Sequence, residues 1–172
     1  RTGVAIAEVR HGDGRFHVTL ADGEALPTSH LLVAAGRAPN LERLNLEAAN
    51  VAWDRRGVTV DRRLRSTTNP KFFAAGDVAG PFQFTHVAGY HAGVILRNAL
   101  FRLPAKANYT AVPWVTYTDP ELGQVGLTEA DARAAHGDSI RVLRAHFNEN
   151  DRAQAERRTE GLMKLVTDRH GK

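Results

Sequence analysis

The segment Lys71–Val78 is the feature of this sequence that most constrains the fold. It reads KFFAAGDV, an apolar run typical of a strand that ends in Gly76 and Asp77. Such a strand places the carboxylate at its carboxyl end, where open α/β sheets bind ligands. Gly76 and the flanking alanines have little side chain, so the carbon chain of a polyol could lie against the backbone. Asp77 is therefore the first candidate binding residue, the alternative being that it starts a turn or caps a helix.

Length and composition set outer limits on the function. The 172 residues suffice for one domain or two small ones, and 42% hydrophobic with 24% charged residues is typical of a globular protein. No apolar run approaches a membrane span and no signal-peptide pattern opens the chain, so we expect a cytoplasmic protein without a membrane partner. The net charge of +4 comes from scattered arginines, which gives no reason to expect nucleic-acid binding. The absence of cysteine excludes a disulfide, a thiolate nucleophile and a zinc–thiolate site within the chain.

The first third of the chain predicts short strands. Val4–Val9 and Phe16–Leu20, joined by a Gly-Asp-Gly turn, predict an antiparallel meander. Leu31–Ala35 is continuously apolar, which predicts a strand buried on both faces. Gly57–Asp61 predicts another short strand.

A helix is expected from Thr85 to about Arg102. Thr85 can cap its start and Pro104 can end it, while Gly89 and Gly93 permit close packing against a neighbour. The apolar side at helical spacing consists of Ala88, Ala92, Ile95, Leu96, Ala99 and Leu100. The stretch from Pro104 to Tyr109 is the expected domain boundary.

Beyond this boundary the order of elements predicts an α+β module. Val112–Tyr117 is expected to be a strand, and Thr128–Asp131 is a capping box that opens a short helix ended by Gly137. Two further strands are expected at Ile140–Phe147 and Gly161–Thr167.

Several motifs in a fixed order are more specific than any single Gly-Asp pair. Together they resemble the second half of the FAD-dependent pyridine nucleotide-disulfide oxidoreductases, most closely the dihydrolipoamide dehydrogenase and mercuric reductase branch. The motifs are Leu32–Asn40 (LVAAGRAPN), Gly57–Asp61 (GVTVD), Phe73–Val78 (FAAGDV), Thr85–Ala88 (THVA), Val112–Glu121, Val125–Glu129 (VGLTE), Arg152–Ala153 and Glu160–Val166 (EGLMKLV).

The resemblance implies partial FAD- and NAD(P)-binding α/β domains followed by part of an α+β dimerisation domain. Residues 1–37 are similar to the tail of the NAD(P)-binding domain, residues 38–106 to the returning part of the FAD-binding domain, and residues 110–172 to the first half of the dimerisation domain. The implied cofactors are FAD and NAD(P)H, and the implied partners are a second copy of the protein and a disulfide or other small-molecule substrate.

The resemblance also implies which residues contact FAD. Asp77 would accept a hydrogen bond from a ribityl hydroxyl, and the helix that starts near Thr85 would point its amino end at the flavin edge where negative charge collects on reduction. The implied cofactor-binding residues are Gly36, Gly76, Asp77, Val78, Phe84, Thr85, His86 and Val87. No catalytic residue is expected in the chain, and the remaining histidines lack the spacing of metal ligands.

Three residues leave alternatives open. His86 either packs against the flavin or transfers a proton. His91 stands where the family often carries a glutamate, which leaves any ion pair there in doubt. Arg37 lies either near the nucleotide or on an ordinary surface.

The chain lacks the other parts that such enzymes need. It has no G-x-G-x-x-G turn for the FAD pyrophosphate, no cysteine pair, no glycine-rich turn for NAD(P)H and no C-terminal His-Glu pair. We therefore expect a fragment of a flavoprotein disulfide oxidoreductase that is inactive by itself. The alternatives are a non-catalytic dimerisation module, or a relative of the NADH oxidases or ferredoxin reductases.

Overall fold

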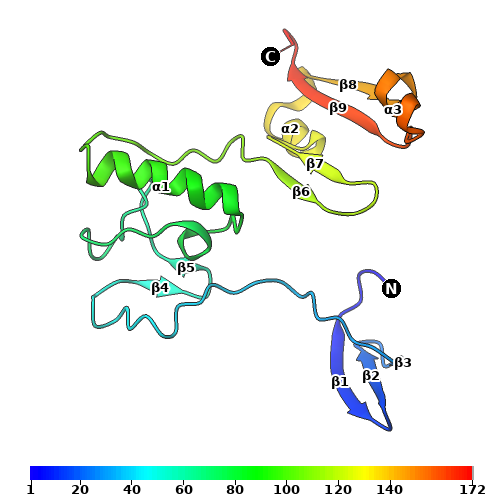
Figure 1. Cartoon of the computed structure of the whole chain (residues 1–172), viewed down its shortest axis with the longest axis horizontal. Coiled ribbons are helices and arrows are strands. Elements are labelled where there is room, and N and C mark those ends of the chain that lie inside the picture. Colours follow the sequence, from blue (N-terminus) through cyan, green and yellow to red (C-terminus); the bar gives the residue numbers. More distant parts are fainter. Residues whose placement is uncertain (172) are drawn as a thin grey trace. The chain divides into compact units, whose positions relative to one another are not determined.

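The computed structural model describes residues 1–171 and divides the chain into two compact units, Arg1–Ala38 and Pro39–Lys172 (Figure 1). Lys172, the last residue of the expected dimerisation segment, lies outside the described residues. Within the described range, no helix has the length and apolar character needed to cross a membrane.

The first unit contains the expected antiparallel meander. Its strands are β1 (Ile6–Gly12), β2 (Arg15–Leu20) and β3 (Ala25–Thr28), in the sheet order β1-β2-β3. Asp13 and Gly14 connect β1 to β2 with φ angles of 52° and 70°, the positive values that a two-residue hairpin turn requires. This part of the sequence prediction is confirmed.

The buried strand predicted at Leu31–Ala35 is wrong. These residues form no strand in the structure, and the side chains of Leu32 and Val33 are 89% and 75% exposed. A strand requires a hydrogen-bonded neighbour, and no described residue pairs with this segment. Apolar composition alone could not supply that neighbour.

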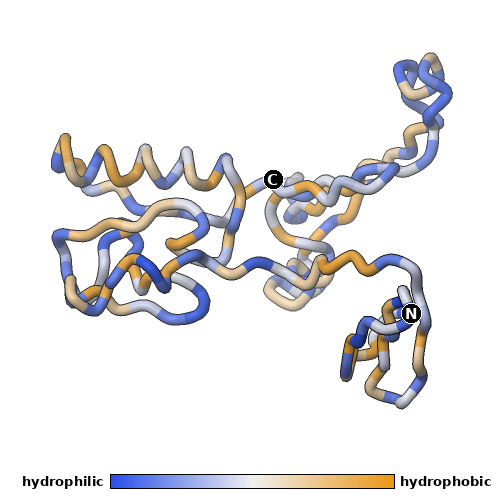
Figure 2. The backbone as a smooth tube through the Cα atoms, turned by 60° about the horizontal axis from the view of Figure 1, so that its bottom comes forward, coloured by the Kyte–Doolittle hydropathy of each residue, from blue (hydrophilic) through white to orange (hydrophobic). Residues whose placement is uncertain are grey.

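In residues 39–111 a helix packs on a set of loops and short strands. The hairpin β4 (Trp53–Asp54) and β5 (Gly57–Val58) is followed by two isolated bridges, Val60 to Ser66 and Arg65 to Phe73. The strand predicted at Gly57–Asp61 is therefore shorter than expected. The helix α1 (Thr85–Ala99) lies along these loops, and hydrophobic residues recur along its whole length (Figures 1 and 2).

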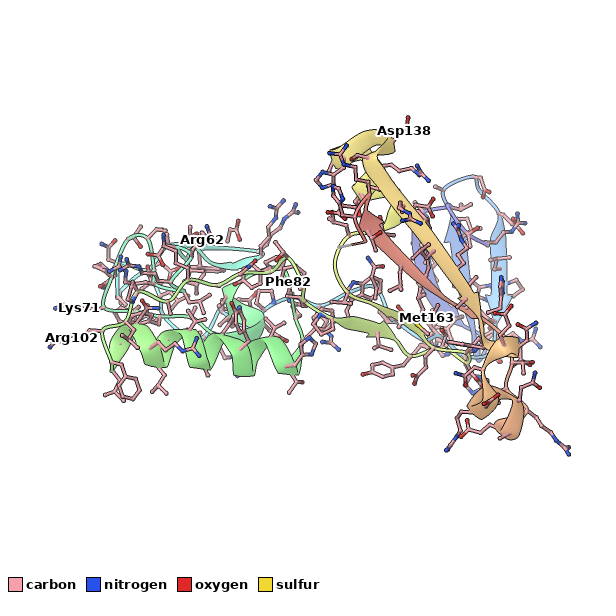
Figure 3. The ribbon with its side chains drawn as sticks, turned by 90° about the horizontal axis from the view of Figure 1, so that it is seen from above. Arg62, Lys71, Phe82, Arg102, Asp138 and Met163 are labelled. Atoms are coloured by element: carbon pink, nitrogen blue, oxygen red, sulfur yellow. The ribbon has the colours of Figure 1, made fainter. Side chains whose placement is uncertain are left out.

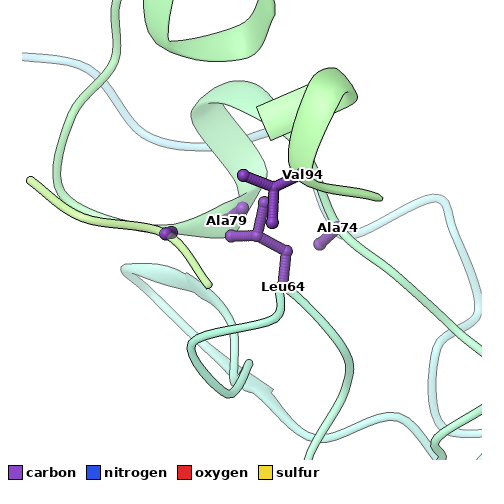
Figure 4. Packing of buried hydrophobic residues seen from close by; sticks show 5 residues of the cluster. Leu64, Ala74, Ala79 and Val94 are labelled. Atoms are coloured by element: carbon purple, nitrogen blue, oxygen red, sulfur yellow. The ribbon is translucent and has the colours of Figure 1, made fainter. Parts of the chain in front are cut away.

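The core of this region is small and continuous. Leu64 is 1% exposed and Val94 of α1 is 2% exposed, and they meet in the packed cluster of Figure 4. The other buried members of the cluster are Ala74, Ala79 and Ala107.

The predicted strand ending in Gly-Asp requires a correction. Gly76–Ala79 forms a 3₁₀ helix, η1, so Asp77 lies in a helical turn and not at the end of a strand. Ala75 before it is extended, with φ −134° and ψ 150°. Among the described residues, the segment before η1 has a single bridge, at Phe73, which is too little pairing to form a strand.

The predicted helix is present, but its ends and its buried face differ. Phe84 is the N-cap and Thr85 is already helical, so the Thr85 side chain does not cap the helix. The helix ends at Ala99 with Leu100 as its C-cap, and Arg102, with a left-handed φ of 55°, turns the chain away from a helical path.

The face of α1 that faces the core is different from the predicted apolar side. The buried residues are Val87, His91 and Val94. Of the residues on the predicted apolar side, Ala88 and Ile95 are half-buried, and the exposed ones are Ala92, Leu96, Ala99 and Leu100. A methyl group on Gly89 or Gly93 would meet no atom of another described element within 4 Å, so neither glycine is needed for close packing within residues 1–171.

Residues 112–171 form the expected α+β module. The elements are β6 (Trp114–Thr116), β7 (Leu122–Gln124), α2 (Glu129–His136), η2 (Gly137–Ser139), β8 (Ile140–His146), η3 (Phe147–Glu149), α3 (Asp151–Glu156) and β9 (Leu162–Asp168). Thr128 caps α2 by accepting a 3.1 Å hydrogen bond from the Asp131 amide, and Gly137 ends the helix with φ 60°. The Thr128 cap of the predicted capping box is therefore confirmed, while the Asp131 carboxylate accepts from the Thr128 hydroxyl at 2.6 Å. The sequence did not indicate β7 and α3.

Candidate functional site

Gly76 brings η1 against the first turns of α1. Its φ is +69°, and a Cβ placed on it would lie 3.1 Å from the Cβ of Ala88. Glycine is therefore needed here both for backbone conformation and for close approach. Asp77 follows directly and its side chain is exposed. The structure thus places one accessible carboxyl group beside the amino-terminal part of α1.

A second glycine, which sequence reasoning did not single out as part of the site, supports the same turn. Gly57 of β5 has φ +139°, and a Cβ on it would lie 2.6 Å from the backbone oxygen of Val78 in η1. Any side chain at Gly57 would therefore displace η1. The only signal in the sequence was a glycine that begins an apolar run, which does not reveal such a contact.

The amino end of α1 carries no side-chain cap. Phe84 is the N-cap, and its apolar side chain makes no capping hydrogen bond. The first N–H groups of a helix have no partner within the helix, and the helix dipole makes this end favourable for negative charge. Thr85 and His86 are exposed here, whereas Val87 is buried. The end of the helix can therefore donate to an anionic or oxygen-rich ligand.

Aromatic rings surround this end of the helix. The imidazole of His86 stacks on Phe84, with ring centroids 5.3 Å apart and planes 10° apart. His86 also lines a pocket of about 220 Å³ together with Val87, Tyr90, Asn108, Ala111, Val112 and Pro113. Phe82 lies at this amino-terminal end of α1, and Lys71 and Arg102 lie at the opposite end (Figure 3).

His91 is the polar residue at the centre of the site, and the sequence analysis gave it no such role. It is 2% exposed, and its Nδ1 accepts a 3.0 Å hydrogen bond from the Gly76 amide. Its Nε2 lies 2.9 Å from the hydroxyl oxygen of Tyr109. Because an amide can only donate, Nδ1 is unprotonated and Nε2 carries the proton that is donated to Tyr109. The partners of His91 are thus an amide and a phenol, not an ion.

Burial determines the protonation of this pair. Desolvation lowers the pKa of His91, which keeps the imidazole neutral at neutral pH. Burial raises the pKa of Tyr109, and the neighbouring Tyr90 raises it further. The Tyr109 ring also packs on Phe82, with centroids 5.2 Å apart. His91 lies four residues after Val87 and three before Val94, so its helical spacing from two buried valines was the signal for its burial.

The other predicted residues are placed as follows. Val78 lies in η1 next to Asp77. Six of the predicted residues therefore come from η1 and the start of α1, namely Gly76, Asp77, Val78, Thr85, His86 and Val87, and Phe84 is the N-cap. Gly36 belongs to the first unit, is exposed and has φ +112°, and its contact with a cofactor stays a prediction. Residues 1–171 contain no group of three or more His, Asp or Glu side chains arranged to hold a metal ion.

Two family models match the chain. The pyridine nucleotide-disulphide oxidoreductase model matches residues 1–92, and the pyridine nucleotide-disulphide oxidoreductase dimerisation-domain model matches residues 112–172. The mercuric reductase of Lysinibacillus sphaericus is 38% identical over 155 residues, which cover 90% of this chain and 28% of that protein. The mercuric reductase of Streptomyces lividans is 39% identical over 163 residues, covering 93% of this chain and 34% of that protein. A dihydrolipoyl dehydrogenase of Bacillus subtilis is 34% identical, covering 81% and 30% respectively.

Solved structures agree in fold. A Cu(II) complex of the HOCl-induced flavoprotein disulfide reductase RclA from Escherichia coli matches with a TM-score of 0.84 and 28% identity, covering 96% of this chain and 38% of that one. LpdA from Mycobacterium tuberculosis matches with a TM-score of 0.85 and 26% identity, covering 96% and 36%. The predicted fold class is therefore confirmed. The chain spans about a third of the length of these relatives.

Proposed function

Because this chain belongs to the pyridine nucleotide-disulphide oxidoreductase family, we propose that it supplies one part of the FAD site of an enzyme that transfers electrons between NAD(P)H and a disulfide or dithiol. The chain has no cysteine, so the redox-active cysteine pair of such an enzyme belongs to residues outside these 172. The chain alone is expected to be inactive.

One observation carries the proposal: the accessible carboxyl group of Asp77 lies in the turn that Gly76 packs against Ala88, beside the uncapped start of α1. A carboxylate accepts hydrogen bonds from hydroxyl groups, and a charged acceptor contributes about 1.5–3 kcal/mol. Asp77 would therefore hold a ribityl hydroxyl of FAD. The first N–H groups of α1 would face the flavin edge, where they favour negative charge. FAD, when bound, would supply the two-electron chemistry.

The same proposal assigns the segments of the chain. Residues 1–37, which include Gly36, form the tail of an NAD(P)-binding domain, and residues 38–106 form the returning part of an FAD-binding domain. Residues 110–172 form the first half of a dimerisation domain. The two family models match residues 1–92 and 112–172, which supports the separation of the third segment from the first two.

The role of Asp77 is tested by Asp77→Ala and Asp77→Asn in the enzyme that contains this chain. Loss of the charged acceptor is expected to weaken FAD binding about tenfold or more for Asp77→Ala, and less for Asp77→Asn, which keeps a neutral acceptor. FAD affinity is measured by titrating the apoprotein and following the visible flavin spectrum. Asp138→Asn in the exposed η2 is the matched control and should leave the affinity unchanged (Figure 3). Unchanged affinity in Asp77→Ala would show that Asp77 does not contact the cofactor.

The dimer is the second part of the proposal, and it concerns the hairpin of β8 and β9. Leu143 pairs with Leu165 and Ala145 with Met163, so these four side chains share one face. The side chains of Leu143, Leu165 and Met163 are 46%, 54% and 53% exposed. Arg144 and Lys164, on the alternate face, pair with Glu129 of α2 at 2.8 and 3.5 Å. We propose that the apolar face meets a second copy of the chain.

Sedimentation tests the dimer. The wild-type chain is expected to show a mass that rises with concentration, and Leu165→Glu should shift it to the monomer because it places a charge on the apolar face. Asp138→Lys, in the exposed η2, serves as the control charge change. A wild-type monomer at all concentrations would refute self-association of this face.

A further inference from the structure

The Gly76–Asp77 turn is held to α1 by one buried side chain. The Gly76 amide donates to His91 Nδ1 at 3.0 Å, and both residues are buried. His91 Nε2 lies 2.9 Å from the Tyr109 hydroxyl, on a segment 18 residues further along the chain. The imidazole therefore connects three parts of the fold: η1, α1 and the stretch that contains Tyr109.

We propose that His91 is a positioning residue for the cofactor site: its neutral imidazole fixes the Gly76 amide and thereby the turn that presents Asp77. This inference rests on the proposed function, since Asp77 is proposed there to bind FAD. His91 does not itself touch the cofactor in this account. It acts through the backbone of the residue that precedes Asp77.

The turn needs such a constraint because glycine supplies none. Gly76 adopts φ +69°, a conformation that glycine permits but does not enforce, so its backbone orientation depends on its contacts. One contact is steric, against Ala88, and limits how far the turn can approach α1. The bond to His91 is directional, and loss of its acceptor would leave a buried N–H group without a partner.

Tyr109 selects the protonation state that this task requires. Nδ1 can accept from Gly76 only when it carries no proton, and the bond from Nε2–H to the Tyr109 hydroxyl favours that tautomer. The titratable groups that contact the imidazole are Tyr109, whose hydroxyl lies 2.9 Å from Nε2, and Tyr90 of α1, whose ring centroid is 6.2 Å away. Both contacts are phenol groups and neither is a carboxylate, and desolvation lowers the pKa of His91, which favours the neutral imidazole.

Three substitutions separate positioning from mere packing. His91→Phe retains a ring of similar size but removes the acceptor. His91→Asn places a side-chain oxygen near the position of Nδ1 and so restores the acceptor for the Gly76 amide. Tyr109→Phe leaves the Gly76 bond in place but removes the group that selects the tautomer. If His91 only fills space, His91→Phe should be the mildest change and His91→Asn the most severe.

The first measurement is hydrogen exchange of the Gly76 amide, followed by NMR, in the full 172-residue chain. His91→Phe is expected to speed exchange about tenfold, His91→Asn to stay within about threefold of wild type, and Tyr109→Phe to lie between them. His136→Phe, at the exposed end of α2, is the control and should not change this amide. Equal protection of Gly76 in wild type and His91→Phe would overturn the inference, as would greater protection in His91→Phe than in His91→Asn.

The second measurement is FAD affinity of the same variants in the enzyme that contains the chain. The expected order of affinity is wild type, His91→Asn, then His91→Phe, with the last about tenfold weaker than wild type. If Asp77→Ala binds FAD normally, the proposed function fails, whereas the amide measurement still decides whether His91 holds the turn. If Asp77→Ala weakens binding and His91→Phe does not, the proposed function stands and the positioning role of His91 is wrong.

Discussion

Residues 39–111 and residues 112–171 belong to one compact unit but are stabilised in different ways. The first region has a buried cluster around Leu64 and Val94 and a buried hydrogen-bonded histidine. In the second region, Ala132 is the one hydrophobic residue that is buried among those described. Its ion pairs join α2 to β8 and β9 through Glu129, and Arg158 pairs with Asp119. The second region therefore has strand pairing and exposed ion pairs in place of a buried cluster of hydrophobic side chains.

The difference indicates that residues 39–111 are better able than residues 112–171 to hold a defined shape without a partner. Exposed ion pairs contribute little each, because water screens them and long side chains lose freedom when they pair. The hydrogen bond from Arg133 and the positive charges of Arg144 and Lys164 lower the pKa of Glu129. The Glu129 carboxylate is therefore well matched to its surroundings, although these ion pairs bury little apolar surface. Exposed apolar strands such as β8 and β9 gain most of their burial from another surface.

Removal of one core side chain should produce the largest effect. Leu64→Ala creates a cavity where Leu64 is 1% exposed, and it is expected to cost about 3 kcal/mol of unfolding free energy. Leu165→Ala is the matched change in the second region, where the side chain is 54% exposed, and should cost less than about 1 kcal/mol in the monomer. Urea unfolding of both variants, at a concentration below that of self-association, measures the two values. Similar losses would refute the contrast between the regions.

Gly57→Ala should produce the second-largest loss of stability. The added methyl group would lie 2.6 Å from the Val78 oxygen and would strain a φ of +139°, so a loss of about 2 kcal/mol is expected. Gly89→Ala, in α1, meets nothing within 4 Å and should stabilise the chain by about 0.5–1 kcal/mol. Thermal unfolding compares the two. A Gly57→Ala variant as stable as wild type would show that η1 does not require the close approach to β5.

Mild acid should produce the smallest loss of stability, and it should act on residues 39–111. The pKa of His91 is lowered in the folded chain, so its contribution to stability is complete above the unfolded value of about 6.5 and is lost as pH falls through the folded value. Asp61 titrates in a separate window. Burial opposes the shift, but the amides of Arg65 and Arg63 lower its pKa below 3.8, so its contribution is lost only in stronger acid.

Urea midpoints between pH 7.5 and 5 isolate the histidine. Wild type is expected to lose stability over this range, and His91→Asn, which cannot titrate, should lose less. A wild-type midpoint that stays constant over the range would contradict the burial of a neutral imidazole at this position.

The sequence by itself determined the features that depend on neighbouring residues along the chain. The meander turn at Asp13 and Gly14, the Thr128 capping box and the presence of α1 follow from local conformational preferences and short-range hydrogen bonds. The ordered motifs were also sufficient to indicate the family, which the family models then showed.

Only the tertiary structure decided which surfaces meet. Leu31–Ala35 has the composition of a buried strand, but a strand requires a partner, and Asp77 lies in a 3₁₀ turn because the segment before it has almost no pairing. The contacts of Gly57 with Val78 and of His91 with Gly76 and Tyr109 join residues 15 to 21 positions apart. Local propensity carries no information about such distances, because the geometry there is set by packing and by the need to satisfy buried polar groups.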